Sequence, residues 1–298
     1  MGYVTPADLT GATTQYISAA GTQGVDFSLY TTAQLQSLID RVSRQIDGFC
    51  RQTFALTNVQ EWYKGRGNNV LRLRKYPLAQ DPDSLLSGQS LVASTTTTAT
   101  VAKGDKAVPV AECSNLLASQ FLQWADGAEA QNTEIATVAT TSGPGTVTLI
   151  SGLSSTHASG ATVAVNTLDF IQIRLPGQTS FPIPIGQLII DADKGLITNY
   201  TPLMFQNLGY ATVFPDMLPL LARYTYGYLA GQVPLVLQEI TIEQCARTVQ
   251  RFAHMGAQGV KSWKLDDQEM TFQNWQPPAL DSDQMERLGP WRRNVGFR

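Results

Sequence analysis

The chain has 298 residues, of which 43% are hydrophobic and only 15% are charged, and its net charge is −3. This length allows one large domain or two ordinary ones, and the low charge fraction indicates that much of the surface is buried in a core or against partner subunits. A general nucleic-acid binder normally carries a strong basic excess, so the composition argues against that class.

The three cysteines, Cys50, Cys113 and Cys245, show no paired spacing, which predicts reduced and mostly buried thiols in a cytosolic setting. The first residues have neither the basic nor the apolar region of a signal peptide. No apolar run approaches the roughly 20 residues that span a bilayer. We therefore expect a protein that is made and used on the cytosolic side and does not bind a membrane.

The first long element is expected to begin at Thr31 or Thr32, either of which suits the N-cap of a helix. The apolar residues that follow recur every three or four positions and therefore share one helix face. They are Leu35, Leu38, Ile39, Val42, Ile46 and Phe49. The pattern predicts an amphipathic helix of about five turns that ends near residues 48–51.

Residues 59–75 alternate between apolar and polar positions on both sides of a glycine- and asparagine-rich stretch, which predicts a β-hairpin. Five basic residues lie in it: Lys64, Arg66, Arg72, Arg74 and Lys75. Their side chains suit either a solvated hairpin or a contact with a neighbouring subunit or with DNA. The sequence leaves these alternatives open.

The composition changes sharply near residue 86. From there to residue 168 the chain is rich in Ser, Thr, Ala, Val and Gly, and short β-branched runs such as 107–110, 133–138 and 146–150 are separated by glycine turns. Several short strands at close spacing predict a small all-β module. Such a module is tolerated as an insertion because its two ends can lie close together.

Beyond residue 169 the pattern returns to helices and strands. The turn residues 191–195 predict a hairpin between 183–190 and 196–200, and residues 223–228 resemble a strand. A second long amphipathic helix is expected over 237–255, followed by a short helical piece near 281–288. We therefore divide the chain into a core of 1–85 and 169–270, an inserted module of 86–168 and a tail of 271–298.

Residues of catalytic or metal-binding type do not form a recognisable constellation. His157 and His254 lack neighbouring ligands at helical spacing. The Asp191–Gly195 run departs from a calcium loop because its glycine comes one position early and Pro202 stands where the bidentate glutamate is needed. The carboxylate pairs Glu129 with Glu134 and Asp266 with Asp267 suit solvated surface acids. We expect no catalytic, cofactor-binding or metal residues, no cofactor and no enzyme activity.

The end of the chain combines arginines with aromatic residues. The residues that suit docking to a partner are Arg287, Trp291, Arg292, Arg293, Phe297 and Arg298. In that interpretation the aromatic side chains anchor the segment and the arginines pair with acids on the partner. A frayed terminus remains the alternative.

Several motifs resemble the head–tail connector (adaptor) family of tailed double-stranded DNA phages. The chain opens with Val4-Thr5-x-x-Asp8-Leu9 and continues with a helix whose 38–54 segment resembles the L-I-x-x-A-S-x-x-I-x-x-Y-C-x-R-x-F run of that family. Further matches are Leu71-x-Leu73 with Pro77, Tyr224-Thr225-Tyr226 with Pro234, Gly259-Val260-Lys261-Ser262, and Trp291-Arg292-Arg293, where the family often has Tyr-Arg-Arg. Val42 departs from the small residue of the family, and residues 101–165 form an insertion that resembles a β module of phage and bacterial surface proteins.

The resemblance implies an α+β fold, with a mainly helical connector core, short β-hairpins and the inserted β module. It also implies a virion protein of the phage neck, assembled in the host bacterial cytoplasm, whose partners are its own copies in a closed ring, commonly twelve-fold, the portal protein, and a stopper or tail-completion protein. Genomic DNA would pass through the ring without sequence-specific binding. The rival hypotheses are a carbohydrate- or host-surface-binding protein that acts through residues 86–168 and, with less support, an enzyme.

Overall fold

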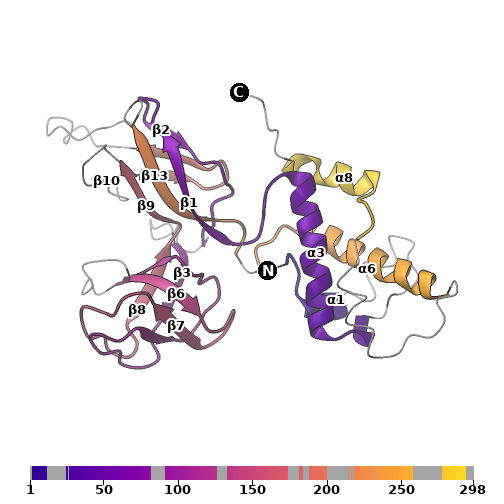
Figure 1. Ribbon diagram of the computed structural model, residues 1–298, viewed down its shortest axis with the longest axis horizontal. Coiled ribbons are helices and arrows are strands. Elements are labelled where there is room, and N and C mark those ends of the chain that lie inside the picture. The colour runs from indigo at the N-terminus through magenta and orange to yellow at the C-terminus, as the bar shows by residue number, and fades with distance from the viewer. Residues whose placement is uncertain are drawn as a thin grey trace. The chain divides into compact units, whose positions relative to one another are not determined.

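The computed structural model describes residues 2–11, 25, 27–81, 91–125, 133–173, 181–183, 188–199, 214, 216, 218–229, 231–257 and 277–292. They belong to two compact units. The helical unit comprises Met1–Ala55 and Gln232–Arg298, and the β unit comprises Leu56–Gly231. Figure 1 shows the helices and the strands, most of them with their labels.

The helical unit joins the two ends of the chain. Its elements are α1 (Pro6–Gly11), η1 (Phe27–Leu29), α3 (Thr32–Cys50), α6 (Leu235–Ala257), α8 (Ser282–Leu288) and η4 (Gly289–Trp291). Helix α3 packs against α1 and α6, and α8 packs against α6 (Figure 1). Among the described residues, no helix has the length and apolar character that a transmembrane span requires.

The start and the end of α3 follow from its sequence. Thr31 is the N-cap: Gln34 N donates to Thr31 Oγ1 at 3.3 Å, and Thr31 N donates to Gln34 Oε1 at 2.9 Å, which completes a capping box. The helix ends where Arg51 adopts a left-handed conformation. The predicted helix and its buried face are confirmed, with Cys50 in place of Phe49 as the last buried residue.

The two C-terminal helices are confirmed as well. Helix α6 covers the predicted 237–255 segment and extends it at both ends. Helix α8 starts at a second capping box, in which Asp281 Oδ1 accepts from Gln284 N at 2.8 Å. Both helices therefore lie where the sequence predicts them.

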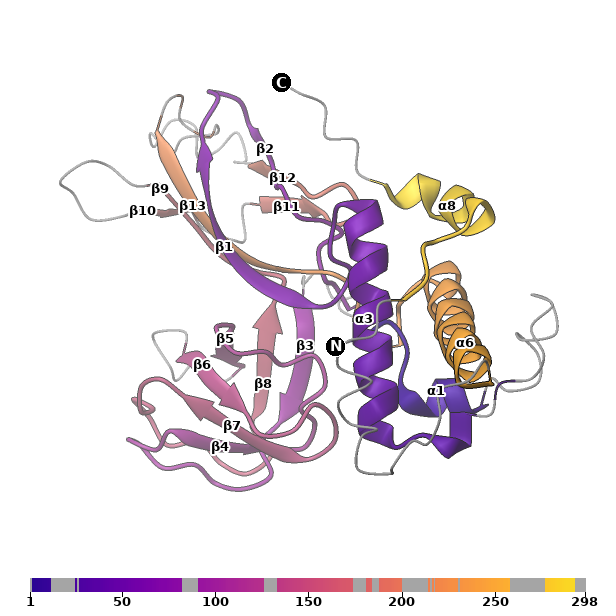
Figure 2. The same cartoon turned by 45° about the vertical axis from the view of Figure 1, so that its right-hand side comes forward.

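Two sheets of the β unit pack face to face. The four-stranded sheet has the order β1 (Thr57–Lys64), β13 (Pro219–Tyr226), β9 (Leu168–Ile173) and β10 (Phe181–Ile183). The three-stranded sheet has the order β11 (Leu188–Asp191), β12 (Leu196–Asn199) and β2 (Val70–Arg72), which Figure 2 shows side by side. Alternate residues of β1 and β13, such as Tyr63, Leu220 and Tyr224, are buried together with Leu71 and Ile197 of the smaller sheet.

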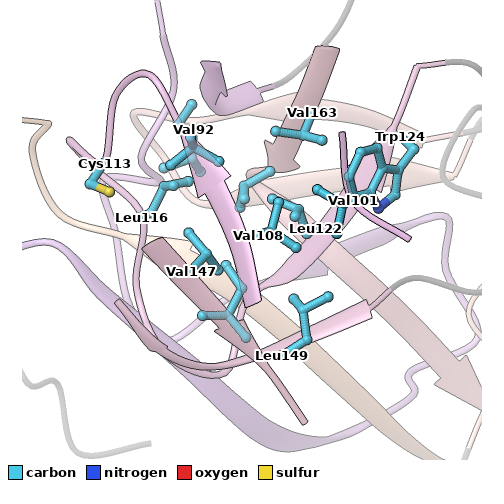
Figure 3. Packing of buried hydrophobic residues seen from close by; sticks show 14 of the residues in the cluster. Val92, Val101, Val108, Cys113, Leu116, Leu122, Trp124, Val147, Leu149 and Val163 are labelled. Carbon is cyan, nitrogen blue, oxygen red and sulfur yellow. The ribbon is translucent and has the colours of Figure 1, made fainter. Parts of the chain in front are cut away.

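The third sheet is curled and has six strands. Its order is β3 (Leu91–Thr96), β8 (Thr162–Asn166), β5 (Phe121–Trp124), β6 (Thr133–Val138), β7 (Gly145–Leu149) and β4 (Ala107–Val110). The outer strands β3 and β4 meet at one end, where Ala111 N donates to Thr96 O at 2.9 Å and Thr98 N donates to Pro109 O at 3.0 Å. The curl encloses an apolar core of mainly Val and Leu side chains, shown in Figure 3. Joining the edges protects them from pairing with other chains.

The expected mainly helical core is wrong, because the protein is mostly β. Segments interpreted as hairpins attached to a helical bundle instead form two packed sheets with their own core. The hairpin expected over 59–75 is also wrong: β1 pairs over its whole length with β13, and β2 pairs with β12. Tertiary pairing overrode the local turn pattern, because β13 pairs with β1 from Thr57 to Lys64 and supplies its backbone hydrogen bonds from far along the chain.

The six-stranded sheet lies inside the expected module of 86–168, and the hairpin of β11 and β12 around Asp191–Gly195 is confirmed. The compact units, however, divide the chain after Ala55 and after Gly231, so all three sheets share one unit and the helices make up the other. The expected tail, 271–298, contains α8 and η4 within the helical unit.

Candidate functional site

Arg287, the first residue of the expected docking segment, is engaged inside the helical unit. Its Nη2 atom lies 2.6 Å from Glu239 Oε2 and its Nη1 atom lies 2.9 Å from Glu243 Oε1, so it bridges two turns of α6. The Arg287 side chain is 27% exposed. Burial alone would lower the pKa of Arg287, but the two glutamates hold it above its ordinary value. In this structure Arg287 fastens α8 to α6.

We expect the Arg287→Met variant to lower the unfolding free energy of the helical unit by about 1–2 kcal/mol, because Glu239 and Glu243 would lose their shared counter-charge. The estimate is at the lower end because the pair is partly solvated. Chemical denaturation followed by circular dichroism at the helix band measures the change. The control is Arg44→Met, since the exposed Arg44 bonds only the Asp40 carbonyl of its own helix among the described residues. Equal losses in both variants would contradict this assignment.

Trp291 and Arg292 pack against the end of α3. The Trp291 ring meets the Phe54 ring edge to face at a centroid distance of 6.0 Å, and Gln52 Nε2 donates to the Trp291 carbonyl at 2.8 Å. The Arg292 guanidinium lies 5.2 Å from the centre of the Phe49 ring. The remaining docking residues, Arg293, Phe297 and Arg298, lie outside the described residues. The part of the segment that the structure describes is therefore anchored in its own unit.

The five basic residues of the 59–75 segment lie around the connection from β1 to β2. Lys64, Arg66, Arg72 and Arg74 are exposed and Lys75 is half-buried. Within the described part of the chain, none of them has an ion-pair partner, although Asp216 lies against Gly67 between them. We call residues 64–75 the basic strip.

Backbone hydrogen bonds hold the basic strip in place. Arg74 N donates to Tyr63 Oη at 3.0 Å, and Lys75 N donates to Tyr224 Oη at 3.3 Å. Both tyrosine hydroxyls also lie within hydrogen-bond distance of Glu61 Oε2, at 2.6 and 2.9 Å. Desolvation raises the pKa of Tyr63 to about 12 and raises that of Tyr224 as well. Both hydroxyls therefore stay protonated at neutral pH and serve as fixed hydrogen-bonding groups.

A further cluster, which the sequence did not suggest, joins the six-stranded sheet to the four-stranded sheet. It starts at Asp169 of β9, which is only 2% exposed. Asn58 Nδ2 donates to Asp169 Oδ2 at 2.9 Å and to Thr225 Oγ1 at 3.1 Å, and Gln120 Nε2 reaches the same threonine at 3.2 Å. Burial raises the pKa of Asp169 to about 7, although the bond from Asn58 and the charge of Arg223 oppose the shift.

Arg223 forms the second half of this cluster. Its guanidinium lies 4.9 Å from the centre of the Phe121 ring and 5.4 Å from that of Phe170. Arg223 Nη1 pairs with Glu134 Oε1 at 3.0 Å, and Nη2 donates to Gln60 Oε1 at 2.6 Å. Arg223 thus links strands of both sheets. We call Asn58, Gln120, Glu134, Asp169 and Arg223 the polar seam.

The described histidine, cysteine and aspartate side chains that could carry chemistry are instead buried or paired within the fold. His157 is buried and stacks on Trp124 at a centroid distance of 3.6 Å. The three cysteines are buried, as predicted, and burial raises the pKa of the Cys50 thiol to about 12. Asp191 pairs with Lys194 within the predicted hairpin turn. Across the described ranges, no group of three or more His, Cys, Asp or Glu side chains is arranged to hold a metal ion.

Three residues considered for chemistry, Glu129, Asp266 and Asp267, lie outside the described residues, and for His254 only the helical backbone is described. Comparison of the chain with family models, with curated proteins and with solved structures gives no match. The described residues thus form three features of interest: an anchored C-terminal segment, a polar seam between two sheets and a basic strip that faces solvent.

Proposed function

We propose that the chain is a structural virion protein, a head–tail connector whose copies form a ring beneath the portal. The ring would extend the DNA channel and offer a docking surface to the stopper or the tail. It would be assembled in the host bacterial cytoplasm and act in the neck of the virion. The observation that carries the proposal is that the helical unit brings together segments from both ends of the chain that resemble the connector family.

The helical unit brings together three of the segments that resemble the connector family, whereas Leu71-x-Leu73 and Tyr224-Thr225-Tyr226 lie in the β unit. Tyr3, which precedes the Val-Thr-x-x-Asp-Leu opening, packs edge to face on Phe54 at 5.9 Å, and Phe54 in turn meets Trp291 of the Trp-Arg-Arg motif. These residues lie at the beginning, in the first quarter and at the end of the sequence, and the whole β unit separates Phe54 from Trp291 along the chain. Three weak motifs that share one packing cluster support the resemblance more than any of them does alone.

The surroundings of the polar groups favour a structural role over an enzymatic one. Asp169 and Arg223 serve as contacts between sheets, Arg287 fastens α8 to α6, and His157 stacks on Trp124. A negative net charge also suits a channel, because extensive phosphate contacts would slow the exit of DNA.

Binding of carbohydrate or of a host surface through the six-stranded sheet has less support. An exposed aromatic platform would favour it, but residues 86–168 contain only two aromatic side chains, Phe121 and Trp124. Phe121 packs on Phe170 and under Arg223, and Trp124 is 7% exposed and stacked on His157. Both rings are therefore committed to contacts within the β unit.

The mass of the purified full-length chain, measured by light scattering at increasing concentration and with added portal rings, tests the proposal. A connector is expected to form ring-sized assemblies by itself or on the portal. An unrelated ring protein of similar size is the control for non-specific association. A chain that remains monomeric and passes portal rings unbound would overturn the proposed function.

A further inference from the structure

The basic strip is unusual in this chain because it contains no acidic residue. Residues 64–75 hold five of the 21 basic residues. The rest of the chain therefore has 16 basic and 24 acidic residues, a charge of −8. Even with Asp216 beside Gly67, the strip is a positive surface on an otherwise negative protein.

The backbone of the strip is fixed before any partner binds. Besides the two tyrosine contacts, Gly65 N donates to Leu218 O at 3.0 Å, Gly67 N donates to Phe214 O at 3.0 Å and Leu73 N donates to Gly195 O at 2.8 Å. Gly67 has φ +67°, a conformation that other residues rarely adopt. A pre-ordered surface loses little conformational freedom on binding. The strip is therefore more ordered than a solvated loop needs to be, and it suits a defined contact with a partner.

The helical unit carries a surface of the opposite charge. Helices α6 and α8 with the Asp281 cap hold five acids, Glu239, Glu243, Asp281, Asp283 and Glu286, against three arginines, Arg247, Arg251 and Arg287, which leaves a charge of −2. Asp283 and Glu286 are exposed: the Asp283 side chain is 74% exposed, although its Oδ2 atom also lies 3.7 Å from Arg287 Nη1. Met285, 40% exposed, lies between them. We call Asp283, Met285 and Glu286 the α8 face.

We propose that the basic strip of one copy docks on the α8 face of a second copy. The inference rests on the proposed function, since it specifies the contact through which the copies would associate. Both surfaces combine charge with an exposed apolar side chain: Val70, 37% exposed, lies within the strip, and Met285 lies on the α8 face. Two different patches that meet between identical chains make a head-to-tail contact, the type that closes into a ring.

Charge complementarity favours a second copy over DNA as the occupant. A DNA-binding surface normally belongs to a protein with a clear basic excess, whereas this chain is acidic outside the strip. Attraction between opposite surfaces also guides the copies into one orientation, because like-charged patches repel each other.

Charge reversal tests the contact. The strip variant carries Arg66→Glu and Arg72→Glu, and the α8 variant carries Asp283→Lys and Glu286→Lys. Each is expected to weaken self-association of the full chain by about a hundredfold or more, because like charges would face each other. An equimolar mixture of the two variants is expected to restore assembly, since each surface then finds an opposite charge only on the other variant. A contact within one chain would give no such restoration.

The control matched to the strip variant is Lys103→Glu with Lys106→Glu, which makes the same change of charge as that variant at exposed positions outside the strip. It is expected to assemble like the wild type, and circular dichroism of every variant checks the fold. If the wild type assembles and the strip and α8 variants do so equally well, or if the mixture fails to assemble, the inference is overturned while the proposed function stands. Strip variants that assemble but no longer retain duplex DNA would assign the strip to phosphate binding and equally overturn it. A wild type that neither self-associates nor binds portal rings overturns both.

Discussion

Replacing Phe54 by alanine is expected to lower the unfolding free energy of the helical unit by about 3–5 kcal/mol. Phe54 is fully buried, and its ring contacts Tyr3 from the start of the chain and Trp291 from its end. Removing the ring leaves a cavity near the end of α3, and both segments lose their ring contact with Phe54. Urea denaturation followed by circular dichroism at the helix band measures the loss.

Phe49→Ala is the matched control for Phe54→Ala. It removes the same ring from a half-buried position at the end of α3, where Arg292 covers it. Its loss is expected to be less than half as large, because less apolar surface returns to water. If the two variants lost equal stability, Phe54 would not be the centre of this cluster.

The second large effect concerns pH and the polar seam. Asp169 has a pKa of about 7 in the folded protein, against an ordinary value near 4 in the unfolded chain. Between these values the folded state holds a proton that the unfolded state has released, so the stability of the β unit decreases as pH rises. The decrease is expected to start near pH 4, to level off above pH 7 and to reach on the order of 4 kcal/mol.

The Asp169→Asn variant separates this effect from other titrations. Asparagine retains an oxygen that accepts from Asn58 but carries no charge at any pH. The variant is expected to match the wild type near pH 4 and to exceed its stability at pH 8, where the wild type buries a carboxylate beside Glu134 and Arg223. Urea midpoints between pH 4 and pH 8 provide the comparison. Parallel pH curves for the two proteins would show that Asp169 does not titrate in this range.

The sequence was informative where structure depends on local signals. The Thr31 and Asp281 capping boxes and the apolar periodicity of α3 and α6 lie within single segments, and all of these helices were predicted. The turn at Asp191–Gly195 is equally local, because its hairpin joins adjacent strands.

The sequence was misleading where the partner of a strand lies far away. Strand β1 pairs with β13 in the register Thr57 to Tyr226, a match that no neighbouring residue encodes. The polar seam was missed for the same reason: Asp169 and Asn58 come from strands separated by the whole six-stranded sheet. A single acid in the mostly apolar run Leu168–Ile173 was the only local signal of it. Arg287 was likewise assigned to a docking segment, because the sequence does not show that it pairs with Glu239 and Glu243 of an earlier helix.

Imaging of the full-length chain mixed with portal rings tests the connector proposal most directly. The expected result is additional ring-shaped density on one side of the portal, coaxial with its channel and made of several copies of the chain. Portal particles that look the same with and without the protein, together with a chain that sediments as single copies, would contradict the account.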